Sequence, residues 1–412
     1  MRLFLLAFKS VFRNKRRSIL NICALCLGMV VMFLGLGWVN GYHTYIYKSL
    51  MDFDTGSAQI LNREYQDQAR RYPLDLTVPD YARFREQLAE NPDIDAVAGR
   101  INFIGTMSAR GNSVTIGVSA VDPTHEAEVT VLQRQIVEGE YLVDGEGGLL
   151  LGRPLADKLK IGVGEVLFLS AVDKDGVVNL IDLPVVGLFS YGYPMMDEGQ
   201  VFITLDSAWA LLGLEDEVTR IVLSLSDSIN PLRWVERHQS DWAETGLAVY
   251  DWKIFASTAV SAVESDSISF YVVLVIIYIL TTIGMLNSMS MSMHERTREF
   301  GTLRAIGMKN RSLLLIITFE GISIALISMV FAMIISAPLV YLLQGIGFSF
   351  GEIMDGGLPI PFGERFRADF RVWQAVLTMG TAIVAAAIGS VLPARRIAKK
   401  TIARSLGGEG VF

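Results

Sequence analysis

The sequence predicts a membrane α-helical protein with four transmembrane helices and a large α+β extracytoplasmic domain inserted between helices 1 and 2. Three observations predict this fold class. Of the 412 residues, 51% are hydrophobic and 19% are charged, which is too apolar for an ordinary soluble enzyme and too charged for a chain that lies wholly in a membrane. The apolar residues gather in four long runs. The charged residues are divided unevenly among the segments between those runs.

Each apolar run reaches or exceeds the ~20 residues that cross a hydrocarbon core. The third run is long enough to tilt or to project beyond the core. The first run is interpreted as a retained helix, because its apolar core is long and the following GWVNGYHTY has no small-x-small cleavage site. The predicted transmembrane helices are residues 18–40, 268–291, 312–343 and 372–392.

Charge predicts the orientation. Residues 1–17 carry six Lys and Arg and no acid, residues 294–311 carry five against two acids, and residues 393–412 carry five against one. Residues 41–267 carry 17 basic and 35 acidic residues. Because Lys and Arg near helix ends favour the cytoplasmic side, both termini and the loop at 292–311 are predicted to be cytoplasmic.

The segments that flank the membrane helices also have patterns of their own. Residues 1–17 place Phe4, Phe8 and Phe12 at helical spacing before a basic cluster, which predicts an amphipathic elbow on the inner membrane face. The outer loop at 344–371 is rich in Gly and Pro, and residues 393–412 form a cytoplasmic tail.

The region 41–267 is predicted to begin and end in helical stalks. Apolar residues keep a helical spacing from Tyr42 to Phe53, and the segment from Ala256 to Ser267 leads helically into the second membrane run. Two stalks side by side would form a rigid lever. A pair of helices that simply link two domains is the alternative.

Between the stalks, strand-like and helix-like segments alternate, which predicts an α+β domain. Two hairpins are expected, one around the turn Arg110–Asn112 and one around Asp173–Gly176. Asp206 is expected to cap a helix. The further predicted segments are a helix from Pro79 to Ala89, a strand from Val218 to Leu225, a helix from Pro231 to Trp242 and a strand from Leu247 to Trp252.

The cytoplasmic segment His294–Arg311 predicts a short amphipathic helix on the membrane surface. Phe300, Leu303 and Ile306 recur at helical spacing and form an apolar face, and Gly307 follows as a C-cap. The remaining charged positions of the segment lie within i,i+3 and i,i+4 reach of their neighbours: Glu295, Arg298, Glu299 and Arg304. A helix that only anchors a loop fits this pattern equally well.

Catalytic and metal-binding motifs are missing from the sequence. It has no G-x-x-x-x-G-K-[ST] phosphate loop, and its His-Glu pairs lack the second histidine of a zinc protease helix. Cys23 and Cys26, the only cysteines, both lie within the first membrane run, where packing explains them better than a metal does. We therefore expect no catalytic residue, no metal and no cofactor in this chain, and no nucleic-acid partner.

The segment ERTREFGTLRAIG at 295–307 resembles the signature of the FtsX-like permease family, the membrane subunits of a class of bacterial ABC transporters. The resemblance implies that residues 292–311 form a coupling helix that docks on a cytoplasmic ABC ATPase dimer. ATP and Mg would be bound by that partner. It also implies a second permease chain, the same or homologous. The implied ATPase contacts are Glu295, Arg298, Glu299, Phe300, Leu303, Arg304, Ile306 and Gly307.

The outer region resembles the periplasmic domains of lipoprotein-releasing permeases of the LolC/LolE type and, more distantly, of MacB-type exporters. The matching segments include EGEYL at Glu138, LPVVGLF at Leu183 and YDW at Tyr250. This resemblance implies a porter-like subdomain with a smaller one inserted at about 122–189. The chain departs from the pattern at 173–176, where a short turn replaces the long hook of one permease in such complexes.

The resemblance implies a non-catalytic subunit of the bacterial inner membrane that extracts or releases lipoproteins or similar amphiphiles, with a periplasmic carrier as a further implied partner. The alternatives are a MacB-like exporter of peptides or small amphiphiles and an FtsX-like signal transmitter to a periplasmic enzyme. Helices 1 and 2 of two copies would line the substrate cavity, with Met29, Phe33, Tyr278 and Met285 as candidates. Glu320, inside the third run, is expected to pair with Arg304, Lys309 or Arg311.

Overall fold

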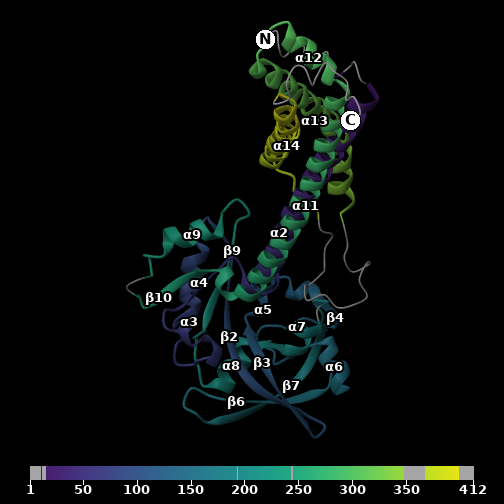
Figure 1. Cartoon of the computed structure of the whole chain (residues 1–412). Coiled ribbons are helices and arrows are strands. Elements are labelled where there is room, and N and C mark those ends of the chain that lie inside the picture. Colours follow the sequence, from purple (N-terminus) through teal and green to yellow (C-terminus); the bar gives the residue numbers. More distant parts are fainter. Residues whose placement is uncertain (1–10, 12–14, 193, 243–244, 348–366, 399–412) are drawn as a thin grey trace. The chain divides into compact units, whose positions relative to one another are not determined.

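The computed structural model describes residues 11, 15–192, 194–242, 245–347 and 367–398 (Figure 1). The predicted phenylalanine stripe of the elbow, most of the outer loop and the end of the tail lie outside these residues. The chain divides into two compact units. The membrane unit comprises Met1–Tyr45, Val263–Phe348 and Phe366–Phe412, and the outer unit comprises Ile46–Ala262 and Ser349–Arg365.

The described part of the chain contains four helices that are long and apolar enough to cross a membrane, as predicted. All four extend beyond the predicted membrane segments because polar residues continue the helices at their ends. Their bounds are α2 (Lys15–Leu50), α11 (Ser257–Glu295), α13 (Asn310–Ile346) and α14 (Val372–Ala398). With 36 residues, α2 is about 54 Å long at 1.5 Å per residue, well above the ~30 Å of a hydrocarbon core.

Helices α2 and α11 run side by side in opposite directions (Figure 1). Glycines of α2 permit the close approach: a Cβ on Gly28 would lie 2.9 Å from Thr281 Cγ2, and one on Gly35 would lie 2.6 Å from Leu274 Cδ2. Farther along, the His43 ring contacts the Ser267 hydroxyl. The two stalk helices are therefore in contact at His43 and Ser267, and the rigid lever stays a prediction.

Small residues also allow α13 and α14 to pack closely. A Cβ on Gly321 would lie 2.9 Å from the Ser390 Cβ and 3.0 Å from the Ala386 oxygen. Ala382 and Ala386 of α14 are almost fully buried, at 1% and 0% exposure. The small-residue face of the fourth run thus packs against protein rather than lipid, as its spacing predicts.

The outer unit is built on a sheet with the strand order β10-β1-β9-β2-β3-β8-β5-β7-β4, and β6 pairs with both β2 and β7. Most neighbours are antiparallel, but β3–β8 and β5–β7 are parallel. The strands are β1 (Ala58–Asn62), β2 (Ile94–Ala109), β3 (Asn112–Val121), β4 (Ile136–Gly139), β5 (Leu149–Gly152), β6 (Val166–Val172), β7 (Val178–Phe189), β8 (Gln200–Thr204), β9 (Arg220–Leu225) and β10 (Leu247–Asp251).

Short helices pack on this sheet and enclose a core that contains Ile101, Leu149, Val201 and Trp234. Both predicted hairpins are present, as β2–β3 and β6–β7. The helices are α3 (Tyr65–Gln68), α4 (Tyr81–Ala89), α5 (Pro123–Val129), α6 (Arg153–Leu159), α7 (Pro194–Gly199), α8 (Leu205–Leu212), α9 (Pro231–His238) and α10 (Trp252–Phe255), with single turns at Met51–Thr55, Ala69–Arg71 and Leu132–Gln135.

The cap of helix α8 differs from the sequence prediction, and two predicted helices are shorter: α4 begins at Tyr81 rather than Pro79, and α9 ends at His238 rather than Trp242. Helix α8 is capped by Thr204, whose hydroxyl accepts a hydrogen bond from the Ser207 amide, and Asp206 lies in the first turn. Strands of the predicted insertion at about 122–189 are hydrogen-bonded to strands outside it, through β5–β8 and β2–β6. The division of the outer unit into two subdomains therefore stays a prediction.

Candidate functional site

The charged segment between the second and third membrane helices forms a short separate helix, α12 (Thr297–Ala305). Helix α11 ends at Glu295, and α13 begins at Asn310. Arg296 stands at the N-terminal boundary of α12 with non-helical dihedral angles. The predicted amphipathic helix is therefore real, but it covers only nine residues of the segment.

A glycine cap ends α12 sharply. Gly307 has φ +102°, and its amide donates to the Arg304 oxygen at 3.0 Å. The Met308 amide donates to the Leu303 oxygen, also at 3.0 Å. This pair of bonds is a Schellman motif, which satisfies carbonyls that the helix end leaves open and turns the chain toward α13. The predicted C-cap at Gly307 is confirmed.

The inner face of α12 is anchored in the membrane unit. Phe300 is only 3% exposed and belongs to the same buried cluster as Met289, Met293 and Leu313. The prediction grouped Phe300 with the apolar side chains that contact a partner. In this structure it packs against the protein's own helices, and Gly301 beside it is also buried.

A salt bridge fixes the start of α12 to the third membrane helix. Arg296 Nη1 lies 3.1 Å from both carboxylate oxygens of Glu320, and each of the two side chains is 12% exposed. Arg296 also lies 3.2 Å from Glu299 and 5.2 Å from the centroid of the Phe300 ring. Glu320 is thus paired with a cation of the segment between the second and third membrane helices, as expected, but the predicted partners were wrong. The sequence pattern did not indicate that Arg296 is the partner of Glu320.

The outer face of α12 is exposed and mixed in character. Ile306 is 79% exposed and Leu303 is 38% exposed. The two aliphatic side chains lie three residues apart, so they are on the same side of the helix end. The charged residues Glu295, Arg298 and Glu299 are exposed around them, and Arg304 is half-buried. The geometry can present an apolar pair inside a charged rim to a partner.

The predicted cavity residues separate into two groups. Met29 and Phe33 line an apolar cavity of about 350 Å³ between α2, α13 and α14, within one chain. Met285 is 1% exposed and packs against α14, where a Cβ on Gly389 would lie 3.3 Å from its sulfur. Tyr278 is half-buried and does not line this cavity. A role of these residues in a cavity between two copies stays a prediction.

In the outer unit, a buried ion pair that the sequence did not signal joins β2 to α5 and to the turn after α2. Arg100 Nη2 and Nε donate to the two carboxylate oxygens of Glu126 at 2.5 and 3.0 Å. Arg100 Nη1 donates to the backbone oxygen of Asp54 at 2.5 Å. Burial disfavours the charged guanidinium, but the facing carboxylates outweigh burial and raise the pKa of Arg100.

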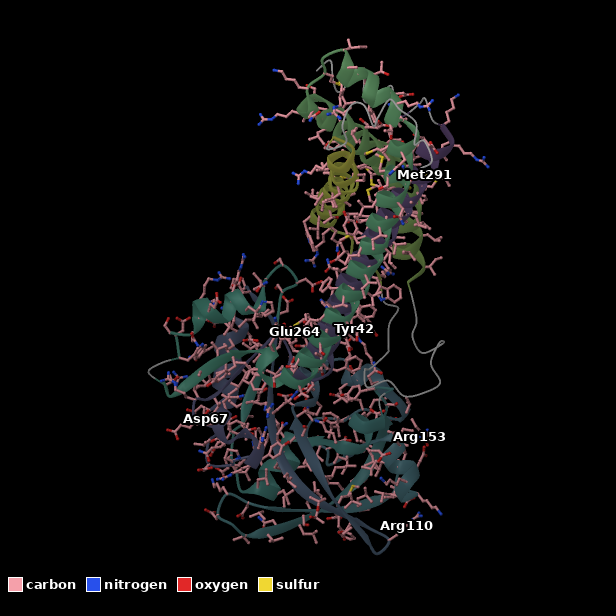
Figure 2. All side chains as sticks on the ribbon, viewed as in Figure 1. Tyr42, Asp67, Arg110, Arg153, Glu264 and Met291 are labelled. Carbon is pink, nitrogen blue, oxygen red and sulfur yellow. The ribbon has the colours of Figure 1, made fainter. Side chains whose placement is uncertain are left out.

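The short turn at 173–176 is a closed, well-bonded hairpin. The Asp173 carboxylate accepts hydrogen bonds from the amides of Asp175 and Val177 and from the Asn179 side chain, at 2.8–2.9 Å. Figure 2 labels Arg110, which lies at the turn of the other hairpin, β2–β3.

Among the described residues, no group of three or more His, Cys, Asp or Glu side chains is placed to hold a metal ion.

In the described part of the chain, four helices that can cross a membrane, an anchored amphipathic helix on one loop and a large α/β domain between the first two helices define a membrane protein with a large domain outside its membrane segments. Residues 18–238 match the family model of the MacB-like periplasmic core domain, and residues 271–402 match that of the FtsX-like permease C-terminal. The chain therefore belongs to the family of FtsX-like ABC transporter permeases that carry a MacB-like periplasmic core.

Two relatives are similar over most of their length. The lipoprotein-releasing system transmembrane protein LolE of Haemophilus influenzae is 19% identical over 91% of this chain and 90% of its own. LolC of Neisseria meningitidis is 22% identical over 74% of this chain and 72% of its own.

Solved structures with partial similarity include two isolated outer domains. The periplasmic region of MacB from Actinobacillus actinomycetemcomitans is 12% identical, with a TM-score of 0.38, over 52% of this chain and 97% of that one. The extracellular domain of YknZ from Gram-positive bacteria is 10% identical, with a TM-score of 0.35, over 48% of this chain and 100% of that one.

Proposed function

We propose that this permease couples ATP hydrolysis by a separate cytoplasmic ATPase to the extraction or release of lipoproteins or similar amphiphiles on the outer side of the bacterial inner membrane. The observation that carries the proposal is the construction of α12. Its inner face is fixed by Phe300 and by the Arg296–Glu320 pair, and its outer face leaves Ile306 and Leu303 exposed. The similarity to LolE and LolC supports lipoproteins as the cargo class.

In this proposal α12 is the coupling helix. An ATPase dimer binds ATP and Mg, and two permease chains, the same or homologous, each offer one α12. Both termini and α12 are cytoplasmic, in agreement with the basic residues at 1–17 and 393–412. A displacement of α12 would reach α13 through the Arg296–Glu320 pair and α11 through their short connection. The chain itself does no bond chemistry.

The docking surface can be tested with one residue. Ile306→Asp in the co-expressed permease–ATPase complex should weaken association by about 2 kcal/mol, or roughly 30-fold in Kd, if Ile306 is a central contact. Ile306→Leu keeps the apolar side chain and is the matched control. Equal co-purification of the ATPase with both variants would remove Ile306 from the proposed interface.

The polar part of the interface needs a separate test. Charge reversal at Glu299 and Arg304, singly and together, should reduce ATPase association, because exposed charges at a rim steer and orient a partner. Association that survives both reversals would remove these residues from the contact, whatever the result at Ile306.

The cargo is tested with the permease and its ATPase in nanodiscs. ATP hydrolysis is measured with and without a triacylated lipoprotein, and with the same protein lacking its acyl chains. Stimulation or release that needs the acyl chains supports lipoprotein extraction. A complex that assembles and hydrolyses ATP but ignores the lipoprotein would favour the second candidate, an exporter of peptides or small amphiphiles. The match of residues 18–238 to the MacB-like core favours that candidate.

A further inference from the structure

The cavity between α2, α13 and α14 exists because small side chains face one another without closing the gap. Five of its lining residues are small, whereas the others are four methionines, one phenylalanine and one valine. The small residues are Ala332, Ser336, Ala337, Ala375 and Thr378, and the larger ones include Met29, Phe33, Met329, Met333 and Met379. Small residues on membrane helices ordinarily bring the helices together. Here the small residues leave a cavity of about 350 Å³ within one chain.

The cavity is apolar and opens toward the surface of the bundle. The Thr378 hydroxyl donates to the Gln374 oxygen at 2.8 Å, so its hydrogen bond is satisfied within α14. Met333 at the mouth is 54% exposed, whereas Met29 and Thr378 at the floor are each 4% exposed. The lining is apolar, and thioether side chains adapt to a flexible hydrocarbon.

The length of the cavity matches one leaflet of a bilayer. On α13 it extends from Met329 to Val340, which is about 16 Å at 1.5 Å per residue. Half of a ~30 Å hydrocarbon core is about 15 Å. These residues lie in the half of α13 that is remote from α12, and Ala375 to Met379 lie in the first third of α14. The cavity therefore occupies the leaflet on the side away from α12.

A cationic segment lies at the outer end of the cavity. The Phe370 ring is 5.4 Å from that of Phe33, which lines the cavity, and the Asp369 amide donates to the Gly37 oxygen at 3.0 Å. Arg371 stands one helical turn before the lining residue Ala375. Its exposed guanidinium pairs with Asp369 at 2.8 Å, and Arg367 nearby is also exposed. Among the described residues 367–371 of this segment, two arginines and one aspartate leave one net positive charge.

We propose that this cavity binds one acyl chain of an anionic phospholipid from the leaflet remote from α12, with the lipid phosphate near Arg367 and Arg371. The apolar lining, the leaflet-length extent and the cationic outer end together fit this ligand. The site is lined by residues of one permease chain. It requires neither the ATPase nor the cargo of the proposed function.

The test uses the full chain in nanodiscs that contain phosphatidylglycerol with a photoreactive group near the end of one acyl chain. After illumination, labelled peptides are mapped by mass spectrometry. Labels should concentrate on the lining segments of α13 and α14. The exposed apolar residues of α11, such as Ile276 and Ile279, report the background labelling by bulk lipid. Labelling at the cavity that equals this background would overturn the proposal.

A matched pair of variants separates the cavity from the general lipid surface. Ala375→Phe fills the cavity and should lose the label on α13, whereas Val376→Phe adds the same ring at a 64% exposed neighbour outside the lining and should keep it. Ala332→Phe fills the cavity from α13 if Ala375→Phe does not yield a monodisperse protein. Retention of the label in a folded cavity-filled variant would contradict the site.

The headgroup is tested with the same photoreactive chain on phosphatidylcholine. Wild type should be labelled less by this lipid than by phosphatidylglycerol, and Arg367→Gln/Arg371→Gln should abolish the difference while cavity labelling remains. Equal labelling of wild type by both lipids would overturn the anionic specificity.

Discussion

Replacement of Glu126 by Gln should destabilise the outer unit strongly. The carboxylate of Glu126 faces Arg100 with two hydrogen bonds, at 2.5 and 3.0 Å, and the side chains are 1% and 3% exposed. Without the negative charge of Glu126, Asp54 is the remaining charged partner of a guanidinium that water does not reach. Removal of one partner from a buried ion pair costs about 3–5 kcal/mol.

For a unit of this size, 1 kcal/mol changes the midpoint of thermal unfolding by about 2–4 °C. We therefore expect Glu126→Gln to lower it by roughly 6–20 °C. The assay is tryptophan fluorescence of the full chain in nanodiscs during heating. Four of the six tryptophans lie in the outer unit and report its unfolding: Trp209, Trp234, Trp242 and Trp252.

The chain provides a matched surface control. Arg110 and Glu165 form an ion pair at 2.8 Å, but their side chains are 58% and 37% exposed. Glu165→Gln should change stability by less than about 1 kcal/mol, because water replaces the lost charge interaction. An equal shift for Glu126→Gln and Glu165→Gln would refute the assignment of Arg100–Glu126 as a buried pair.

A double replacement separates the unpaired charge from the loss of packing. Arg100→Met combined with Glu126→Leu removes both charges and should recover much of the stability lost in Glu126→Gln. Because the pKa of Arg100 is raised, the stability that its charge contributes is lost only as the pH rises through that raised pKa. Alkaline buffers below this pKa should therefore not reproduce the instability of Glu126→Gln. A double variant as unstable as Glu126→Gln would indicate that packing, rather than charge, is responsible.

Three further predictions concern single positions. Gly41→Ala should lower the free energy of unfolding by about 1–3 kcal/mol, because the new Cβ would lie 2.3 Å from a backbone oxygen of the segment before α14. Gly345→Ala is the control, because a Cβ there meets nothing within 4 Å. The midpoints of thermal unfolding of the two variants test this difference. Hydrogen bonds from backbone amides, the largest from Val177, lower the pKa of the Asp173 carboxyl. The stability that this carboxylate contributes is therefore present above its unfolded pKa of ~3.9 and is lost as the pH falls through its folded pKa. Asp173→Ala at neutral pH should therefore speed hydrogen exchange in the β6–β7 turn, and unchanged exchange would contradict this. Glu320→Gln should cost about 3 kcal/mol and increase exchange in α12, whereas unchanged protection of α12 would show that the salt bridge does not anchor it.

Local signals were sufficient for much of the architecture. The four membrane helices follow from length and apolar composition, and the two hairpins follow from their turn residues. The end of α12 follows from Gly307, because a positive φ costs glycine little and other residues more. Each of these features depends on residues close together in the chain.

Contacts between distant residues were decided only by the tertiary structure. A helical pattern shows that Phe300, Met29 and Met285 lie on apolar faces, but a lipid tail, a partner and the protein interior are all apolar, so the pattern does not distinguish them. The fold turns Phe300 and Met285 inward and leaves Met29 at the floor of a cavity.

The ion pairs show the same limit. Arg100 is 26 residues from Glu126, and Arg296 is 24 residues from Glu320. Charge counts predicted which side of the membrane each segment occupies, because that preference depends on the number of cations in a loop. The choice of partner depends on the distance between the two charged groups, because a buried ion pair is favourable only when they are a few ångströms apart. The sequence by itself therefore determined the membrane segments, the turns and the family resemblance, whereas only the packing of distant segments determined which side chains face the protein interior, lipid or water.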